Sequence, residues 1–206
     1  EYKSQKLLYD SGYNWQYLSL FSPVRYQHLS QLEEKSVDSL YIKARAGLYS
    51  RNEDVAVYGF GHFIYQKSFF GYLYPRIVND SNISQRYSGV TKDISRAGFT
   101  SGETDLSGIG FQNNWVTFQI GRGRESWGAG NDIQLALSEV SPPYDYVMLG
   151  SDYGNLRVNY IHGFLESTPD QINRYITARG LEWTNKRSLV LGISEIVIYS
   201  GLNRSI

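Results

Sequence analysis

A glycine-rich segment holds most of the side chains in this sequence that could bind a ligand. Within residues 121–131, glycines separate Arg122, Arg124 and Trp127, and Asn131 follows. Glycine tolerates open backbone conformations, so the Trp127 ring could lie accessible in a loop. An indole ring stacks on the flat face of a sugar, and guanidinium and amide groups donate hydrogen bonds to hydroxyl or carboxylate oxygens. The segment therefore predicts a carbohydrate-binding loop.

The same segment also allows a structural interpretation. Trp127 can instead wedge the loop into the interior of a sheet protein, while Arg124 and Glu125 neutralise one another. Replacing Trp127 with alanine and measuring polysaccharide retention by the folded protein distinguishes the two interpretations. Unchanged retention would exclude the stacking platform.

Two glutamates are a second candidate for chemistry, because paired carboxylates supply acid and base catalysis at a glycosidic bond. Glu182 and Glu195 lie in successive predicted strands of a hairpin, so they could approach each other. Arginines at positions 174, 179 and 187 are close in sequence, however, and ladders of glutamate and arginine commonly satisfy charges inside a barrel. We therefore favour structural roles for both glutamates and predict no catalytic residues.

Other signatures of catalysis or cofactor binding are missing from the sequence. The histidines at positions 28, 62 and 162 lack metal-ligand spacing, and no HExxH motif occurs. No glycine-rich nucleotide loop opens a helix, and no GxSxG motif is present. Lys and Arg total 20 and Asp and Glu total 20, a balance that disfavours nucleic-acid binding. We predict no metal, no cofactor and no nucleic-acid partner.

The elements that carry these residues are predicted to be β-strands. The chain of 206 residues is long enough for one domain, and it contains 18 tyrosines and 20 glycines but one methionine and no cysteine. Tyrosine and glycine at this level are typical of sheets with amphipathic rings at their borders. No run of about eighteen apolar residues is present to form a transmembrane helix. The expected fold class is all-β.

Alternating apolar and polar residues predict about nine strands. In the first of them, Ile42 and Ala44 alternate with Lys43 and Arg45, which favours a barrel strand with lipid outside and a wet interior, or a half-buried strand of a soluble sandwich. Short and long connections roughly alternate, as in an antiparallel up-and-down transmembrane β-barrel. The predicted strands are Leu40–Tyr49, Val55–Gln66, Phe69–Val78, Asp105–Asn113, Trp115–Arg122, Tyr144–Ser151, Leu156–Leu165, Arg174–Trp183 and Ser188–Tyr199.

Two regions follow from this pattern. Residues 1–38 lack regular alternation and are interpreted as a linker or plug-like segment, whereas residues 39–206 carry the barrel strands. The polar stretch Asn79–Thr104 is longer than most hairpin loops and predicts a functional or extracellular loop. Bacterial single-chain barrels close with an even number of strands, so nine predicted strands indicate either part of a larger barrel or a count that is wrong by one strand.

Two blocks of the sequence resemble a known family. Gly121–Pro143, which reads GRGRESWGAGNDIQLALSEVSPP, is similar to the GR…WGPG…L.LS…P signature of the Wzi-like capsule assembly proteins of the bacterial outer membrane. Arg179–Gly201, which reads RGLEWTNKRSLVLGISEIVIYSG, is similar to the later block of that family, HR-L-E-W…L-x-L-G-L-S-E-x-V-I-Y. The two blocks lie in the latter half of the chain.

The resemblance implies a bacterial outer-membrane β-barrel that binds or anchors surface polysaccharide without catalysis. Its partners would be surface polysaccharide, outer-membrane lipid and other envelope proteins, and a long polymer that crosses several weak sites would gain affinity by multivalency. The expected ligand-binding residues are Arg122, Arg124, Trp127, Asn131 and Arg179. The alternatives are a soluble β-sandwich carbohydrate-binding module, a structural barrel subunit of an envelope complex, and a glycan-cleaving enzyme.

Overall fold

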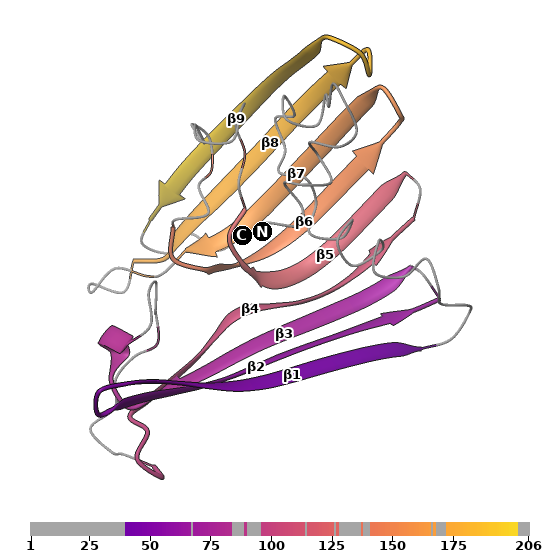
Figure 1. Ribbon diagram of the computed structural model, residues 1–206. Helices are drawn as coiled ribbons and strands as arrows, with labels where there is room; N and C mark the ends of the chain where they lie inside the picture. Colours follow the sequence, from indigo (N-terminus) through magenta and orange to yellow (C-terminus); the bar gives the residue numbers. More distant parts are fainter. Residues whose placement is uncertain are drawn as a thin grey trace.

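Nine β-strands form one antiparallel sheet in which each strand pairs with its neighbours in sequence (Figure 1). The computed structural model describes residues 40–66, 68–83, 89, 96–113, 115–125, 127, 137, 141–165, 167 and 172–201. The strands are β1 (Tyr41–Arg51), β2 (Asp54–Tyr65), β3 (Phe69–Val78), β4 (Ser101–Gln112), β5 (Val116–Gly123), β6 (Tyr144–Asp152), β7 (Leu156–Leu165), β8 (Arg174–Thr184) and β9 (Val190–Ser200), and one short 3₁₀ helix, η2, spans Ser81–Ile83. The predicted all-β, up-and-down antiparallel arrangement is confirmed.

The strand boundaries agree with the sequence pattern except at β4. This strand begins at Ser101 and not at Asp105, because Ser101 and Gly102 pair with Val78 and Ile77 of β3. The long polar connection before β4 is correspondingly shorter than predicted. The register between β3 and β4 shifts at Tyr74 and Pro75, which is the bulge expected where proline cannot donate a ladder hydrogen bond.

The described residues bear on the predicted N-terminal segment and on the absence of a transmembrane helix. The proposed linker or plug-like segment, residues 1–38, lies outside the described residues. Among the residues that the structure does describe, no helix is long and apolar enough to cross a membrane. β1 and β9 are the two edges of the sheet.

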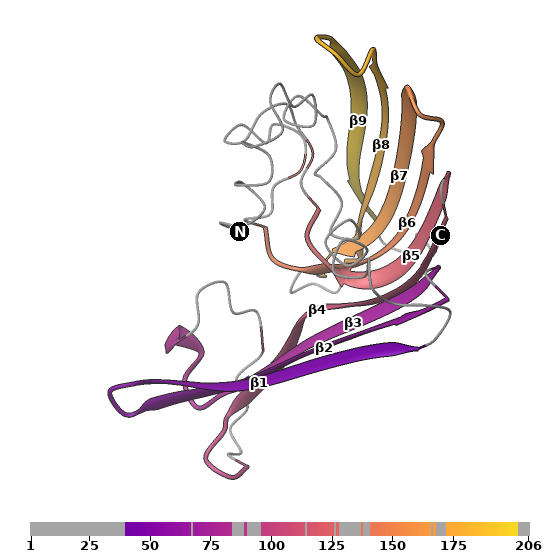
Figure 2. The same cartoon turned by 45° about the vertical axis from the view of Figure 1, so that its right-hand side comes forward.

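The sheet curves strongly, and its two faces differ in character (Figure 2). We call the outer side of the curve the convex face; it carries Ile42, Phe63, Ile109 and Ile193, all exposed. The inner side is the concave face. The buried cluster on the concave face consists of Ile64, Phe70, Trp127, Leu137, Tyr144, Tyr146, Met148, Ile161, Ile176 and Ala178. The apolar core of this sheet therefore lies inside its curve, and the apolar residues outside remain uncovered by described residues.

Aromatic rings lie over glycines of neighbouring strands on both faces. A Cβ atom added at Gly71 would overlap the ring of Phe63, and one added at Gly110 would overlap the ring of Phe70. Tyr144 packs in the same way against Gly163 of β7. Each ring shields the backbone that the glycine exposes, which is a recognised device for stabilising curved sheets. This packing gives several glycines of the strands a structural role.

Candidate functional site

The middle of the concave face holds a buried hydrogen-bonded group. Gln119 of β5, whose side chain is fully buried, donates hydrogen bonds of 2.6 Å to the hydroxyl oxygens of Tyr72 and Tyr146. The Tyr146 hydroxyl in turn donates to a carboxylate oxygen of Glu125 at 3.2 Å. A buried amide without partners would be costly, so these contacts fix β3, β5 and β6 relative to one another.

An ion network lies beside this group, towards the end of the sheet where β5 leaves it. Arg76 of β3 contacts Glu103 and lies 3.2 Å from Asp105. The Nη2 atom of Arg124 donates to Asp105 at 2.5 Å, and its Nε atom donates to the Ser141 carbonyl oxygen at 2.7 Å. The bulge in β3–β4 brings Asp105 to this position, between two guanidinium groups. Arg124 is thus held by the fold and ties the connection after β5 to β4.

The environment of Trp127 matches the structural interpretation, in which the ring is buried, and not the accessible loop. Its side chain is 1% exposed and packs in the concave cluster, and its backbone pairs with Leu137 through hydrogen bonds of 2.9 and 3.1 Å. Trp127 and Leu137 form an isolated β-bridge, and both belong to the buried cluster that includes Tyr146 and Met148 of β6. Trp127 therefore is a core residue here, and the expected stacking platform is not formed. Asn131 lies outside the described residues.

The other two predicted ligand-binding arginines lie on the convex face. Arg122 of β5 forms an ion pair with Asp145 at 3.0 Å, and Arg179 of β8 forms one with Glu195 at 3.0 Å. Because Arg124 and Trp127 lie on the concave side, the fold does not bring the predicted set together. The four described members of the set therefore do not converge on one site.

The two glutamates considered for acid–base chemistry also lie on opposite faces. Glu182 is fully buried on the concave side, where the Nη1 atom of Arg157 lies 3.8 Å from its carboxylate. Glu195 points to the convex face and pairs with Arg179. In the β8–β9 register Glu182 lies opposite Gly192, an offset of three residues from Glu195. The pair therefore cannot act on one glycosidic bond.

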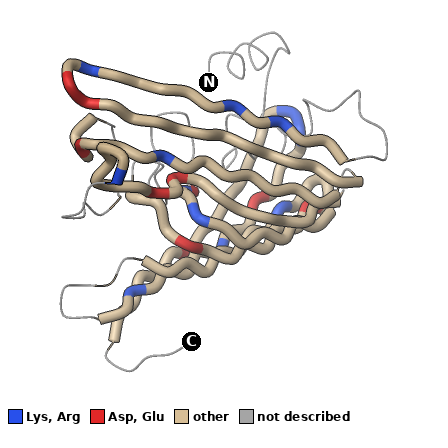
Figure 3. The backbone as a smooth tube through the Cα atoms, turned by 90° about the horizontal axis from the view of Figure 1, so that it is seen from below, with Lys and Arg blue, Asp and Glu red and all other residues tan. Residues whose placement is uncertain are grey.

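A basic cluster on the concave side of β1 and β2 is the strongest remaining candidate for a binding site. Lys43 pairs with His62 across the two strands, and Arg45 is the next residue of β1 on the same face. Neither Lys43 nor Arg45 forms an ion pair with a described residue, and Figure 3 shows only basic positions along the middle of β1. The alternation in this strand predicted that the two cations face water, but no feature of the sequence indicated a site here.

His62 adds a polar group to this cluster. Its side chain is 5% exposed, yet neither ring nitrogen has a hydrogen-bond partner among the described residues. Its ring lies 5.8 Å from that of Tyr41 and 5.7 Å from that of Phe60. Two cations, an imidazole and flanking rings are the groups that bind a carboxylate-bearing sugar by charge-assisted hydrogen bonds and stacking.

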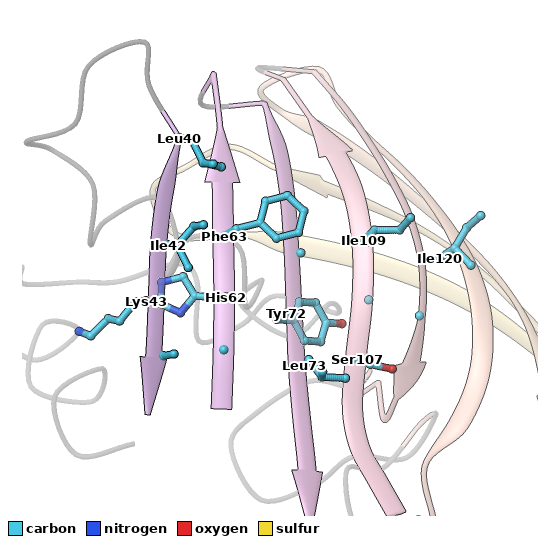
Figure 4. Close-up of a pocket in the computed structure, with 15 residues that line it drawn as sticks. Leu40, Ile42, Lys43, His62, Phe63, Tyr72, Leu73, Ser107, Ile109 and Ile120 are labelled. Atoms are coloured by element: carbon cyan, nitrogen blue, oxygen red, sulfur yellow. The ribbon is translucent and has the colours of Figure 1, made fainter. Parts of the chain in front are cut away.

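The convex face carries a groove of a different kind. Its volume is about 720 Å³, and it extends from β1 to β5 over the small residues Ala44 and Gly61. Figure 4 shows apolar side chains along it, with Lys43 extending away. These apolar residues are Leu40, Ile42, Phe63, Leu73, Ile109 and Ile120. Such a lining suits hydrocarbon and not a polar ligand.

Metal binding has no support in the part of the chain that the structure describes, where no group of three or more histidine, aspartate or glutamate side chains converges. Comparisons with protein families, curated proteins and solved structures find no match to this chain. Function must therefore be inferred from the two faces of the sheet.

Proposed function

We propose that this sheet forms part of the wall of a β-barrel in the bacterial outer membrane, with its convex face against lipid. The observation that supports this proposal is the exposure of aliphatic side chains over the whole convex face, up to 72% for Ile193 and 62% for Ile109. Soluble monomers rarely expose apolar patches beyond a few hundred Å². Alternation of apolar outward and polar inward residues is the pattern of transmembrane barrel strands.

A soluble β-sandwich would require a second sheet over the apolar face. All nine described strands belong to one sheet, and the residues of the convex face have no second layer packed on them within the described ranges. The concave face, by contrast, carries the buried cluster together with tyrosine hydroxyls and buried ion pairs. A membrane barrel is therefore favoured over a sandwich.

We infer that the barrel binds acidic surface polysaccharide without catalysing its cleavage. Lys43 and Arg45, which form no ion pair with a described residue, and the neighbouring His62 supply donors for sugar carboxylates on the interior side of the wall. The resemblance of Gly121–Pro143 and Arg179–Gly201 to capsule assembly proteins supports surface polysaccharide as the ligand, and the cations add the preference for acidic sugars. Modest affinity at one such cluster suffices when a polymer contacts several.

Extraction of cell membranes tests the membrane location. We expect the protein to stay in the membrane fraction after washing with alkaline carbonate and to be released only by detergent. Carbonate removes peripheral proteins, whereas a barrel is held by its apolar exterior. Release into the carbonate wash, with a stable monomer in water, would overturn the barrel proposal.

Binding of a polysaccharide that contains uronic acid tests the ligand class. The change is the double substitution Lys43→Gln and Arg45→Gln, which removes both charges and keeps polar side chains. We expect affinity to fall at least about tenfold, since each charge-assisted hydrogen bond contributes on the order of 1.5–3 kcal/mol. The control is Lys186→Gln with Arg187→Gln, which removes the same charges from the exposed β8–β9 turn.

Two outcomes would contradict the ligand proposal. Equal loss in the control would indicate a general charge effect, and no measurable binding by the wild type would exclude acidic polysaccharide as its ligand. The second result, combined with firm membrane retention, would favour the alternative of a structural barrel subunit in an envelope complex.

A further inference from the structure

The convex face contains four charged residues within the nine described strands, and they form two ion pairs. Arg122 and Asp145 join β5 to β6, and Arg179 and Glu195 join β8 to β9, each at 3.0 Å. Their side chains are 35% to 64% exposed. Charged groups at the centre of a lipid-facing surface are destabilising, whereas near the interface they cost little. The positions of the two ion pairs therefore indicate how deep this part of the convex face lies in the membrane.

The two pairs do not lie on one row across the sheet. Following direct cross-strand partners from Asp145 leads to Phe164, then to Tyr175 of β8. Arg179 lies four residues beyond Tyr175 along β8. Relative to the row of Asp145, the second ion pair is thus displaced by four residues along the strands, towards the short turns. Three strand spacings separate the β5–β6 pair from the β8–β9 pair.

This displacement corresponds to a definite angle. Strands rise about 3.3 Å per residue and lie about 4.8 Å apart, so four residues over three strand spacings give a slope of about 40°. Strands of membrane barrels tilt by about 35–45° from the membrane normal. If the strands have this tilt, the two ion pairs lie at one depth in the membrane.

Two further polar residues of the convex face lie between the pairs. His162 of β7 and Thr177 of β8 are direct cross-strand partners, and the Nδ1 atom of His162 lies 3.3 Å from the Thr177 hydroxyl oxygen. The row of cross-strand partners that starts at Asp145 passes through Phe164 and Tyr175. His162 and Thr177 each lie two residues from that row, towards the short turns. They are therefore halfway between the row and the level of Arg179. We call Arg122, Asp145, His162, Thr177, Arg179 and Glu195 the polar diagonal.

The residues on the two sides of the polar diagonal differ. On the side of the short turns, the convex face carries exposed aliphatic and aromatic residues such as Leu149, Leu181 and Ile193. On the side of the long connections lies a ring cluster, in which Tyr175 stacks on Tyr199 at 5.4 Å and contacts Phe164 at 5.6 Å. Tyrosines gather at membrane–water interfaces because the ring is apolar and the hydroxyl is polar.

The ends of the strands shift in the same direction as the polar diagonal. Ala44 of β1 and Tyr199 of β9 lie on one unbroken row of cross-strand partners. β1 continues from Ala44 as far as Arg51, whereas β9 continues from Tyr199 only to Ser200. The stagger of the sheet therefore agrees independently with a tilted boundary.

We propose that the polar diagonal marks the level at which the convex face passes from the hydrocarbon core into the lipid headgroup layer, on the side of the long connections. This proposal rests on the membrane location proposed above and adds the tilt of the sheet and the residues that contact headgroups. The Arg–carboxylate pairs match the mixed charges and hydrogen-bonding groups of that layer. Residues on one cross-strand row must then lie at different depths.

Nitroxide spin labels on one row provide the test. Ile109 of β4 and Val197 of β9 are exposed aliphatic residues on the same unbroken row of partners, but they lie on opposite sides of the polar diagonal. Each is replaced by cysteine in the full chain, labelled and reconstituted into phospholipid vesicles. Accessibility to oxygen reports the hydrocarbon core, and accessibility to a water-soluble nickel complex reports the headgroup side.

We expect the label at Ile109→Cys to be more accessible to oxygen and the label at Val197→Cys to be more accessible to the nickel complex. Equal depths at both positions, with oxygen favoured at each, would overturn the proposed boundary and keep the membrane location. Nickel accessibility at both positions, with the protein recovered outside the vesicles, would overturn the membrane location itself. Labels at Leu73 and Phe164, another pair on one row, repeat the test if a variant does not reconstitute.

Discussion

Two arginines that lie two residues apart in the sequence have different environments on the two faces of this sheet. Arg122 is on the convex face in a half-exposed ion pair with Asp145. Arg124 follows the end of β5 at Gly123, turns to the concave side and is buried between Asp105 and the Ser141 carbonyl group. The convex face carries exposed apolar groups and few charges, whereas the concave face buries Arg124 in an ion network with Asp105. Because β5 ends between them, two neighbouring arginines of the glycine-rich segment lie on opposite faces of the sheet.

The largest effect is expected at the concave core. Trp127→Ala should lower the free energy of unfolding by about 3–5 kcal/mol, because the truncation leaves a cavity in the buried cluster. The convex Trp183→Ala serves as the control and should cost clearly less in detergent micelles, which fill the space left by the ring. Denaturant unfolding in micelles measures both, and equal losses would remove the distinction between the faces.

The two arginines provide a matched comparison. Arg124→Met leaves the buried Asp105 without one of its two guanidinium partners, so the expected loss of stability is about 3 kcal/mol. Arg122→Met breaks a half-exposed pair and should cost at most about 1 kcal/mol. Unfolding midpoints in the same detergent give both values. A larger loss of stability for Arg122→Met than for Arg124→Met would contradict the assignment of Arg124 to the buried network and of Arg122 to the exposed pair.

A charge introduced on each face tests which face meets lipid. Leu73→Arg on the convex face should destabilise the membrane-inserted protein by about 2–4 kcal/mol. Ile198→Arg, at an exposed aliphatic position on the concave face of β9, should have a much smaller effect because it faces the wet side. Folding into vesicles, followed by gel mobility, compares the two variants. Poor folding of Ile198→Arg alone would contradict the orientation of the wall.

The smallest effect is expected at the exposed pair of β8 and β9. Replacing both Arg179 and Glu195 with glutamine removes a pair whose side chains are more than half exposed, so stability should change by less than about 1 kcal/mol. Denaturant unfolding in micelles measures the change. A loss of several kcal/mol would place this pair in an apolar environment and contradict its location at a membrane interface.

The strands could be predicted from the sequence because the period of two is clear in them. In β1 the alternation of Ile42 and Ala44 with Lys43 and Arg45 identifies both the strand and its two faces. The β4 boundary could not be predicted, because the polar residues Ser101 and Gly102 join the ladder only through pairing with β3. Pairing partners distant in sequence decide that boundary.

The site was harder to predict than the fold, for reasons of register and chain direction. Whether Glu182 and Glu195 meet depends on the β8–β9 register, which places Glu182 opposite Gly192. The burial of Trp127 depends on the turn of the chain after Gly123 and on its pairing with Leu137. Lys43 and His62 come together only through the β1–β2 register. None of these contacts can be read from the spacing of residues within one strand.

Contact between the convex face and lipid is tested most directly by the fluorescence of Trp183. The protein and its Trp183→Phe variant are reconstituted into vesicles whose lipids carry bromine along the acyl chain, and the difference between them reports Trp183 alone. We expect strong quenching of this difference signal, because Trp183 is on the convex face and 38% exposed, while the buried Trp127 contributes equally to both samples. A Trp183 signal that brominated lipid leaves unchanged and aqueous iodide quenches would contradict the membrane location.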